Sequence, residues 1–103
     1  MTITKELATE IVLSALADAN DELPDEEHFE VSRETVLFGT DAEIDSLTLV
    51  SLIVDVEQAV ADKTGQVVTL TDERAMRREP SPFHTADTLS DYIVELSEVV
   101  SRR

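Results

Sequence analysis

The residue with the clearest chemical potential is Ser46, which follows Asp45 and precedes Leu47 at the start of a strongly patterned segment. A serine acts as a nucleophile only when a general base lies within hydrogen-bond reach of its hydroxyl. Both histidines, His28 and His84, fall in loop segments where nothing pairs them with Ser46. The Gly-x-Ser-x-Gly turn of many hydrolases is absent. We therefore expect no catalytic residue and no metal site, but a serine that is modified.

A phosphate ester is the modification that the position of Ser46 favours. Asp45 is a good N-cap residue, and Ile44 and Leu49 have the spacing of a hydrophobic staple across a first helical turn. A helix is therefore expected to begin at Ser46. The free backbone N–H groups and the positive dipole end at a helix N-terminus stabilise an anion.

The helix that begins at Ser46 is expected to run to about Ala61, with Gly65 as its stop. Its core-facing residues follow the i, i+3, i+4, i+7 rule and are Leu49, Leu52, Ile53, Val56 and Val60. A second apolar stripe has two interpretations: a helix that is buried on most sides, or a face that docks a partner. The docking face would consist of Leu47, Val50, Val54, Asp55, Glu57 and Asp62, with Asp45 at its rim.

Helical spacing of apolar residues predicts further helices on both sides of this one. The first covers about Ile3–Asn20, and a short one runs from its cap at Thr71–Asp72 to about Arg78. Thr85 is expected to cap the last helix, which has Tyr92 beside an apolar face of Leu89, Ile93, Leu96 and Val100. The prediction is an all-α fold, a small four-helix bundle with three longer helices, a short third helix and a long loop between helices one and two.

The long loop covers about residues 21–44 and has too many apolar side chains for a solvated linker. These are Phe29, Val31, Val36, Leu37 and Phe38. We expect the loop to cross the helices and plug one end of the core, with Gly39 allowing a turn. A second apolar stretch, which contains Val67, Val68 and Leu70, is interpreted as an extended connector, because no second strand is predicted to pair with it.

Composition narrows the class of protein further. The 103 residues predict one domain over 1–103, with 8 basic and 23 acidic residues and a net charge of −15. Such a surface repels nucleic acid and favours basic protein partners. No cysteine, no membrane-length apolar run and no calcium-loop pattern is present, so no metal and no membrane span are expected. The first residues lack a signal-peptide layout, which predicts a cytoplasmic protein.

The stretch from Asp45 to Glu57 resembles the acyl carrier proteins and the related peptidyl carrier domains. In that family, the serine of an Asp-Ser-Leu motif carries a 4′-phosphopantetheine arm, which a phosphopantetheinyl transferase adds from coenzyme A. The resemblance implies that Ser46 carries the arm, with Asp45 and Leu47 beside it. It implies a monomeric carrier and no enzyme. Acyl thioesters on the arm would be presented to acyl-transfer or ligase enzymes with basic docking surfaces, in fatty-acid, polyketide or related biosynthesis.

The resemblance extends over about residues 7–96. It matches Glu57 to an acidic surface position, Leu52, Val56 and Val60 to core positions, and Thr85 with Asp91-Tyr92-Ile93 to the last helix. It also implies that the core can part to shelter an acyl chain. Three residues depart from the family pattern, namely the neutral Thr48 and Ser51, and Gly39, which lies seven residues before the serine. The departures concern the partner enzymes rather than the attachment.

Two other interpretations remain open from the residues alone. An aminoacyl or peptidyl carrier would have the same tether, and an acidic helical interaction module without a prosthetic group would use Ser46 only as a helix start. The basic cluster of Arg74, Arg77 and Arg78 either balances local acids or contacts the phosphopantetheine or an acidic partner.

Overall fold

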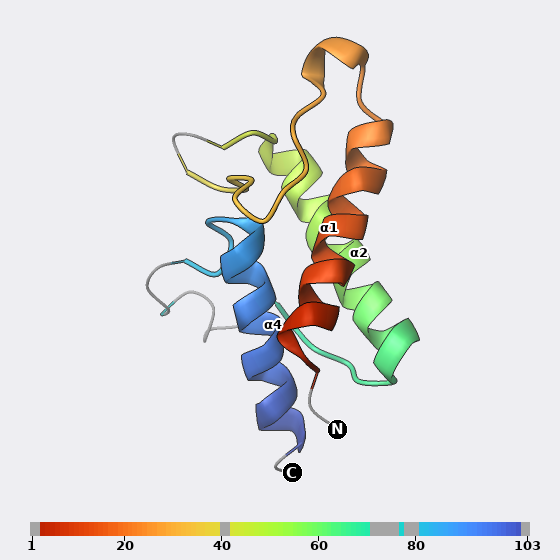
Figure 1. Cartoon of the computed structure of the whole chain (residues 1–103), viewed down its shortest axis with the longest axis vertical. Helices are drawn as coiled ribbons and strands as arrows, with labels where there is room; N and C mark the ends of the chain where they lie inside the picture. The colour runs from red at the N-terminus through yellow and green to blue at the C-terminus, as the bar shows by residue number, and fades with distance from the viewer. Residues whose placement is uncertain (1–2, 40–41, 71–76, 78–80, 102–103) are drawn as a thin grey trace.

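The computed structural model describes residues 3–39, 42–70, 77 and 81–101, and for Ser46 and residues 99–101 it describes only the backbone (Figure 1). Within these ranges the elements are α1 (Lys5–Asp21), the 3₁₀ helix η1 (Asp25–Glu27), α2 (Ser46–Thr64) and α4 (Ala86–Ser101), without a strand. The all-α class is confirmed for the described part of the chain. The short helix after Thr71 lies outside the described residues apart from Arg77, so the four-helix bundle stays a prediction.

Helix α1 begins after Thr4, whose hydroxyl accepts a hydrogen bond from the Leu7 N–H at 3.1 Å. This is N-cap geometry, and it sets the start two residues later than predicted. Ile3 instead lies buried before the helix and donates its N–H to the Ser97 hydroxyl of α4 at 3.0 Å. The core face of α1 consists of Ala8, Ile11, Val12, Ala15 and Leu16, whereas Leu7 is only partly buried.

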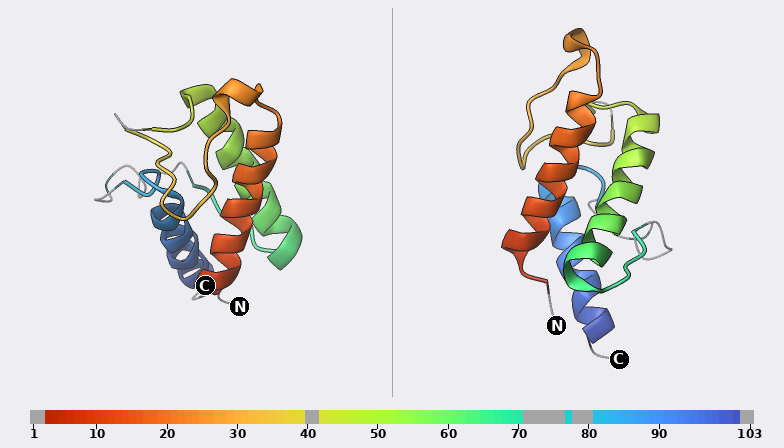
Figure 2. Two further views of the ribbon diagram at one scale, coloured as in Figure 1. Left: turned by 45° about the horizontal axis from the view of Figure 1, so that its top comes forward. Right: turned by 90° about the vertical axis from the view of Figure 1, so that its right-hand side faces the viewer.

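Helix α1 packs against both α2 and α4, and both views in Figure 2 show this arrangement. All five predicted core residues of α2 are buried. Gly65 ends α2 with a φ of 75° and donates its N–H to the Ala61 carbonyl at 2.8 Å, which confirms the predicted stop. From α4 the core receives Leu89, Tyr92, Ile93 and Leu96. Val100 was predicted to lie on the same apolar face, but its side chain is outside the described part of the chain.

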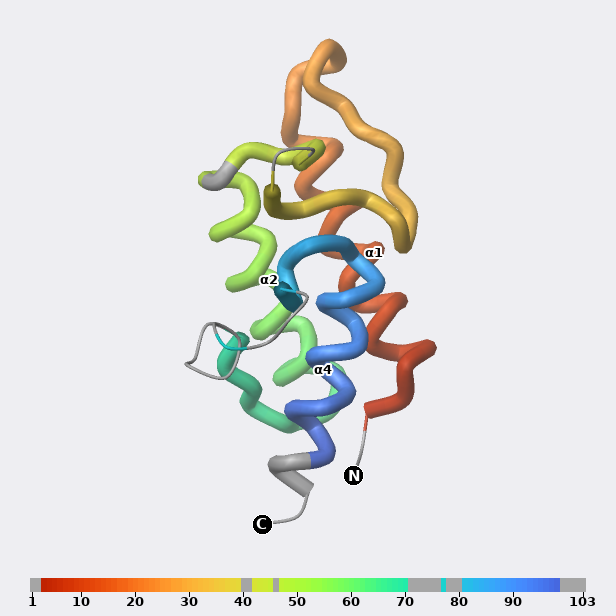
Figure 3. Tube along the Cα trace, turned by 90° about the vertical axis from the view of Figure 1, so that its left-hand side faces the viewer, coloured from red at the N-terminus to blue at the C-terminus, as the bar shows by residue number. Residues whose placement is uncertain are grey.

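The long loop lies over one end of the helices, above the first turn of α4 (Figure 3). The Leu37 N–H donates to the His84 carbonyl at 2.8 Å, and Val36 forms an isolated antiparallel bridge with Thr85. Leu37 is 1% exposed, so the prediction that this loop plugs the core is confirmed. Phe38 was wrongly counted among the plugging residues. It is 56% exposed, because adjacent side chains of an extended segment point to opposite sides.

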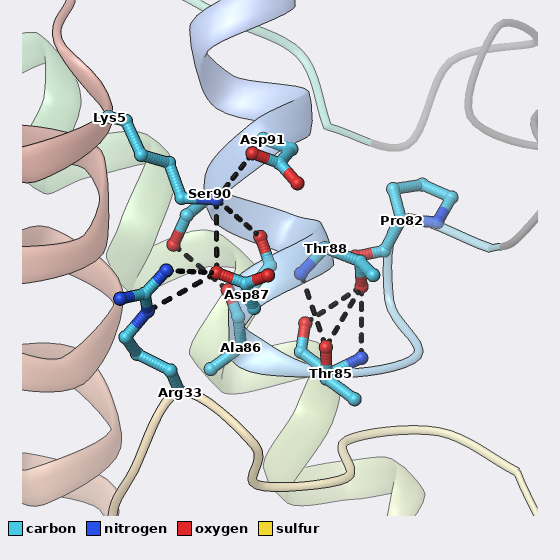
Figure 4. Close-up of polar contacts among 9 residues, drawn as sticks. All are labelled: Lys5, Arg33, Pro82, Thr85, Ala86, Asp87, Thr88, Ser90 and Asp91. Carbon is cyan, nitrogen blue, oxygen red and sulfur yellow. Dashed lines mark hydrogen bonds and ion pairs between the residues drawn. The ribbon is translucent and has the colours of Figure 1, made fainter.

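Polar contacts fix the first turn of α4 to the rest of the fold (Figure 4). Thr85 and Thr88 form a reciprocal capping box, in which each hydroxyl accepts the other residue's backbone N–H, at 3.2 and 3.0 Å. Asp87 accepts from Arg33 of the loop at 2.9 Å and pairs with Lys5 of α1 at 3.0 Å. Lys5 also pairs with Asp91. One carboxylate therefore joins three segments that are distant in the sequence.

This charge cluster gives the folded protein a defined pH response. Hydrogen bonds from Lys5 and Arg33 lower the pKa of Asp87, so its stabilising effect exists above the ordinary value of 3.8 and is lost as pH falls through the lower folded pKa. We expect Asp87→Asn to cost about 1 kcal/mol or less near pH 7, because the pairs are partly exposed. Urea unfolding near pH 7 and in acid should show this difference shrink as pH falls through the lowered folded pKa of Asp87. An equal loss at both pH values would contradict the pairing.

Candidate modification site at the start of α2

Asp45 initiates α2 in the way that the sequence predicts. Its backbone is extended, with φ −82° and ψ 169°, and its Oδ1 accepts the Thr48 N–H at 2.7 Å. The Asp45 carbonyl then accepts the Leu49 N–H at 3.0 Å, the first i to i+4 bond of the helix. Ser46 is consequently the first helical residue, at the positive end of a 19-residue helix.

The Asp45 carboxylate is held in its charged form by the helix that it caps. Hydrogen bonds from the backbone N–H and the hydroxyl of Thr48 lower the pKa of Asp45, with a smaller effect from the Leu47 N–H. Hydrogen bonding to the charged form of an acid has this effect because protonation would weaken the bonds. Thr48 therefore contributes to the cap through both of its polar groups.

Removal of this cap should weaken the start of α2. We expect Asp45→Ala to lower stability and to increase hydrogen exchange at the Thr48 amide, because that N–H loses its acceptor. Asp45→Asn should remain close to the wild type, since asparagine is an equally good N-cap. The difference between Asp45→Ala and the wild type should shrink in acid, as pH falls through the lowered pKa of Asp45. Amide exchange measured by NMR for the three proteins checks this, and unchanged exchange in Asp45→Ala would contradict it.

The segment before Asp45 is also connected to the loop. The Glu43 N–H donates to the Val36 carbonyl at 2.8 Å, and a Glu43 carboxylate oxygen accepts the Val36 N–H at 3.0 Å. Val36 in turn bridges to Thr85 at the cap of α4. A short series of backbone contacts thus leads from the start of α4 to within three residues of Ser46.

An apolar pocket of about 310 Å³ lies beside the start of α2. Its lining residues are Leu37, Phe38, Gly39, Ala42, Ile44 and Leu49. Ile44 and Leu49, the predicted staple, are both buried and both line it. Gly39 has a φ of 121°, which confirms the predicted turn there. Sequence reasoning missed this pocket, although the run Leu37-Phe38-Gly39 is an apolar segment followed by a turn residue.

The second stripe of α2 is exposed to solvent. Leu47, Val50 and Val54 are 77%, 58% and 54% exposed, which excludes the interpretation that the helix is buried on most sides. Exposed apolar side chains that adjoin one another indicate an interaction surface more strongly than scattered ones. Asp55 and Asp62 are exposed near this strip. Glu57 is only partly buried, and its carboxylate accepts the Leu70 N–H at 2.8 Å.

Comparisons with known proteins match nothing. No family model, no curated protein and no solved structure matches the chain. Statements about its function therefore depend on its own residues and their geometry.

The remaining candidate residues have simpler surroundings. His28 and His84 are exposed loop residues, and His28 Nε2 lies 2.9 Å from the Leu23 carbonyl. Over the described ranges, no group of three or more metal-ligating side chains could hold an ion, and no helix is long and apolar enough to cross a membrane. Arg77 is exposed, whereas Arg74 and Arg78 lie outside the described residues.

Proposed function

We propose that this protein is a carrier of the acyl carrier type, with a 4′-phosphopantetheine arm on Ser46. The observation that carries the proposal is the place of Ser46 as the first residue of a capped helix, directly before the exposed Leu47. A phosphodiester at this point would lie at the positive end of the α2 dipole. The charged cap Asp45 is already engaged by Thr48, which supports an anchor site rather than a catalytic one.

The arm would supply the chemistry that this chain lacks. The sequence contains no cysteine, and a thioester needs a thiol, which phosphopantetheine brings with it. The role of the chain is then to hold the arm and to be recognised. Catalysis would belong to the enzymes that load, extend or remove the acyl group.

Recognition is proposed to use the exposed strip of Leu47, Val50 and Val54, which we call the α2 strip. Its apolar side chains would contact the partner, and the net charge of −15 would steer enzymes with basic docking surfaces. Among the described residues, the side chains that line the pocket beside the start of α2 are apolar, which favours acyl over aminoacyl cargo.

Intact-mass measurement tests the proposed function. After incubation with coenzyme A and a permissive phosphopantetheinyl transferase, the protein should gain the mass of one phosphopantetheinyl group. It should then gain a free thiol that reacts with maleimide, although the chain has no cysteine. An unchanged mass would favour an acidic interaction module without a prosthetic group.

A further inference from the structure

The connector after α2 runs back along the helix that it follows (Figure 2). Gly65 reverses the chain, and residues 66–70 then alternate in burial, as an extended segment does. Val68 and Leu70 are 5% and 0% exposed, whereas Val67 is 80% exposed. One side of this connector therefore belongs to the core, and the other side faces solvent.

A hydrogen bond between Glu57 and Leu70 helps to hold the connector in this position. Leu70 is fully buried, and a buried backbone N–H needs an acceptor. Glu57 Oε2 provides it at 2.8 Å. Because Glu57 precedes the end of α2 by seven residues, this bond attaches the connector alongside the helix rather than at its tip.

The position of Glu57 also defines one edge of the α2 strip. Glu57 follows Val50 by seven residues and Val54 by three, so it shares their side of the helix. At about 100° per residue, Asp55 lies about 160° away from Glu57 around the helix, with Val54 between them. Asp62 follows Asp55 by seven residues and extends the same edge. The strip thus has an acidic edge on one side and the connector on the other.

We infer that Glu57 is a positioning residue, which fixes the connector to α2, and that it is not one of the acids that a basic partner enzyme recognises. The inference rests on the proposed function and refines its docking face. An amide oxygen can accept a hydrogen bond from the same backbone N–H as a carboxylate oxygen. Glu57→Gln therefore removes the charge and keeps the bond, and Glu57→Ala removes both.

The first experiment measures hydrogen exchange at the Leu70 amide by NMR. Glu57→Ala should exchange roughly tenfold faster than the wild type, because the buried N–H loses its acceptor. Glu57→Gln should remain protected, as should Asp55→Asn, the matched control two residues away on the same helix. Wild-type protection in Glu57→Ala would overturn the positioning role. This measurement needs no modification of Ser46, so it holds even if the proposed function fails.

The second experiment measures kcat/KM for a permissive phosphopantetheinyl transferase acting on each variant at low salt. Asp55→Asn should lower it roughly two- to fivefold, because a charge that steers a basic partner is lost. Glu57→Gln should match the wild type, although it loses the same charge from the same helix. Equal losses in the two variants would identify Glu57 as a docking acid and overturn the inference, while the proposed function would stand.

Discussion

Replacing Ser46 with alanine should abolish the proposed attachment of phosphopantetheine, which is the largest effect that we expect. The alanine side chain has no oxygen to form the phosphodiester, and no neighbouring hydroxyl takes its place in the helix. Ser46 is the first residue of α2, whereas Thr48 is engaged with Asp45. Ser51 lies more than one turn farther along the helix. Intact mass after treatment with coenzyme A and transferase measures the loss.

Ser51→Ala is the matched control, since it removes an exposed serine hydroxyl from the same helix. It should become modified to the same extent as the wild type. Urea unfolding of Ser46→Ala should remain close to that of the wild type, because alanine is a good helix former at a position just inside the cap. If Ser46→Ala still becomes modified, even slowly, the assignment of Ser46 as the attachment site is refuted.

Replacing Tyr92 with alanine destabilises the fold by about 3–5 kcal/mol, as is typical of a buried aromatic side chain. Tyr92 is fully buried and is the largest of the fully buried side chains in the described part of the chain. Its removal from α4 leaves a cavity that the aliphatic residues around it cannot close without moving the helices. Domains have only about 5–15 kcal/mol of stability in total, so this loss is a large fraction of it. Urea unfolding at neutral pH measures the change.

Phe38→Ala is the comparison for Tyr92→Ala, because Phe38 is an aromatic residue of similar size that is 56% exposed. Phe38→Ala should lower the free energy of unfolding by less than about 1 kcal/mol, because an exposed side chain contributes little packing. Tyr92→Phe should fall between the two, since it keeps the ring and loses only the hydroxyl. A loss in Phe38→Ala equal to that in Tyr92→Ala would contradict the burial pattern.

Local chemistry explains why the start of α2 could be predicted from the sequence. An N-cap, a staple and a C-terminal glycine act within a few residues of one another, so Asp45, Ile44 and Gly65 reveal both ends of the helix. Apolar spacing likewise identified the core face of α2. The same spacing could not decide whether the second apolar stripe of α2 is buried or exposed. It identifies an apolar surface but not whether another element covers that surface.

Contacts between distant residues explain what the sequence did not reveal. The bond from Leu70 to Glu57 and the ion pair of Arg33 with Asp87 depend on how the chain returns to itself. An acid such as Glu57 has the same appearance in the sequence whether it faces water or a backbone N–H. Phe38 and Leu37 are neighbours with similar hydrophobicity, yet Leu37 is buried and Phe38 is exposed, a difference that their residue types do not reveal.

The backbone contacts from Thr85 through Val36 to Glu43 affect when the proposed modification site is complete during synthesis. The partners are about fifty residues apart in the chain, and such non-local contacts form only after both segments have left the ribosome. A nascent chain that ends before Thr85 would contain Ser46 and the loop that precedes it, but the loop would lack its bridge from Val36 to Thr85. Under the proposed function, the transferase would meet a fully braced acceptor only after the segment at Thr85 has been made.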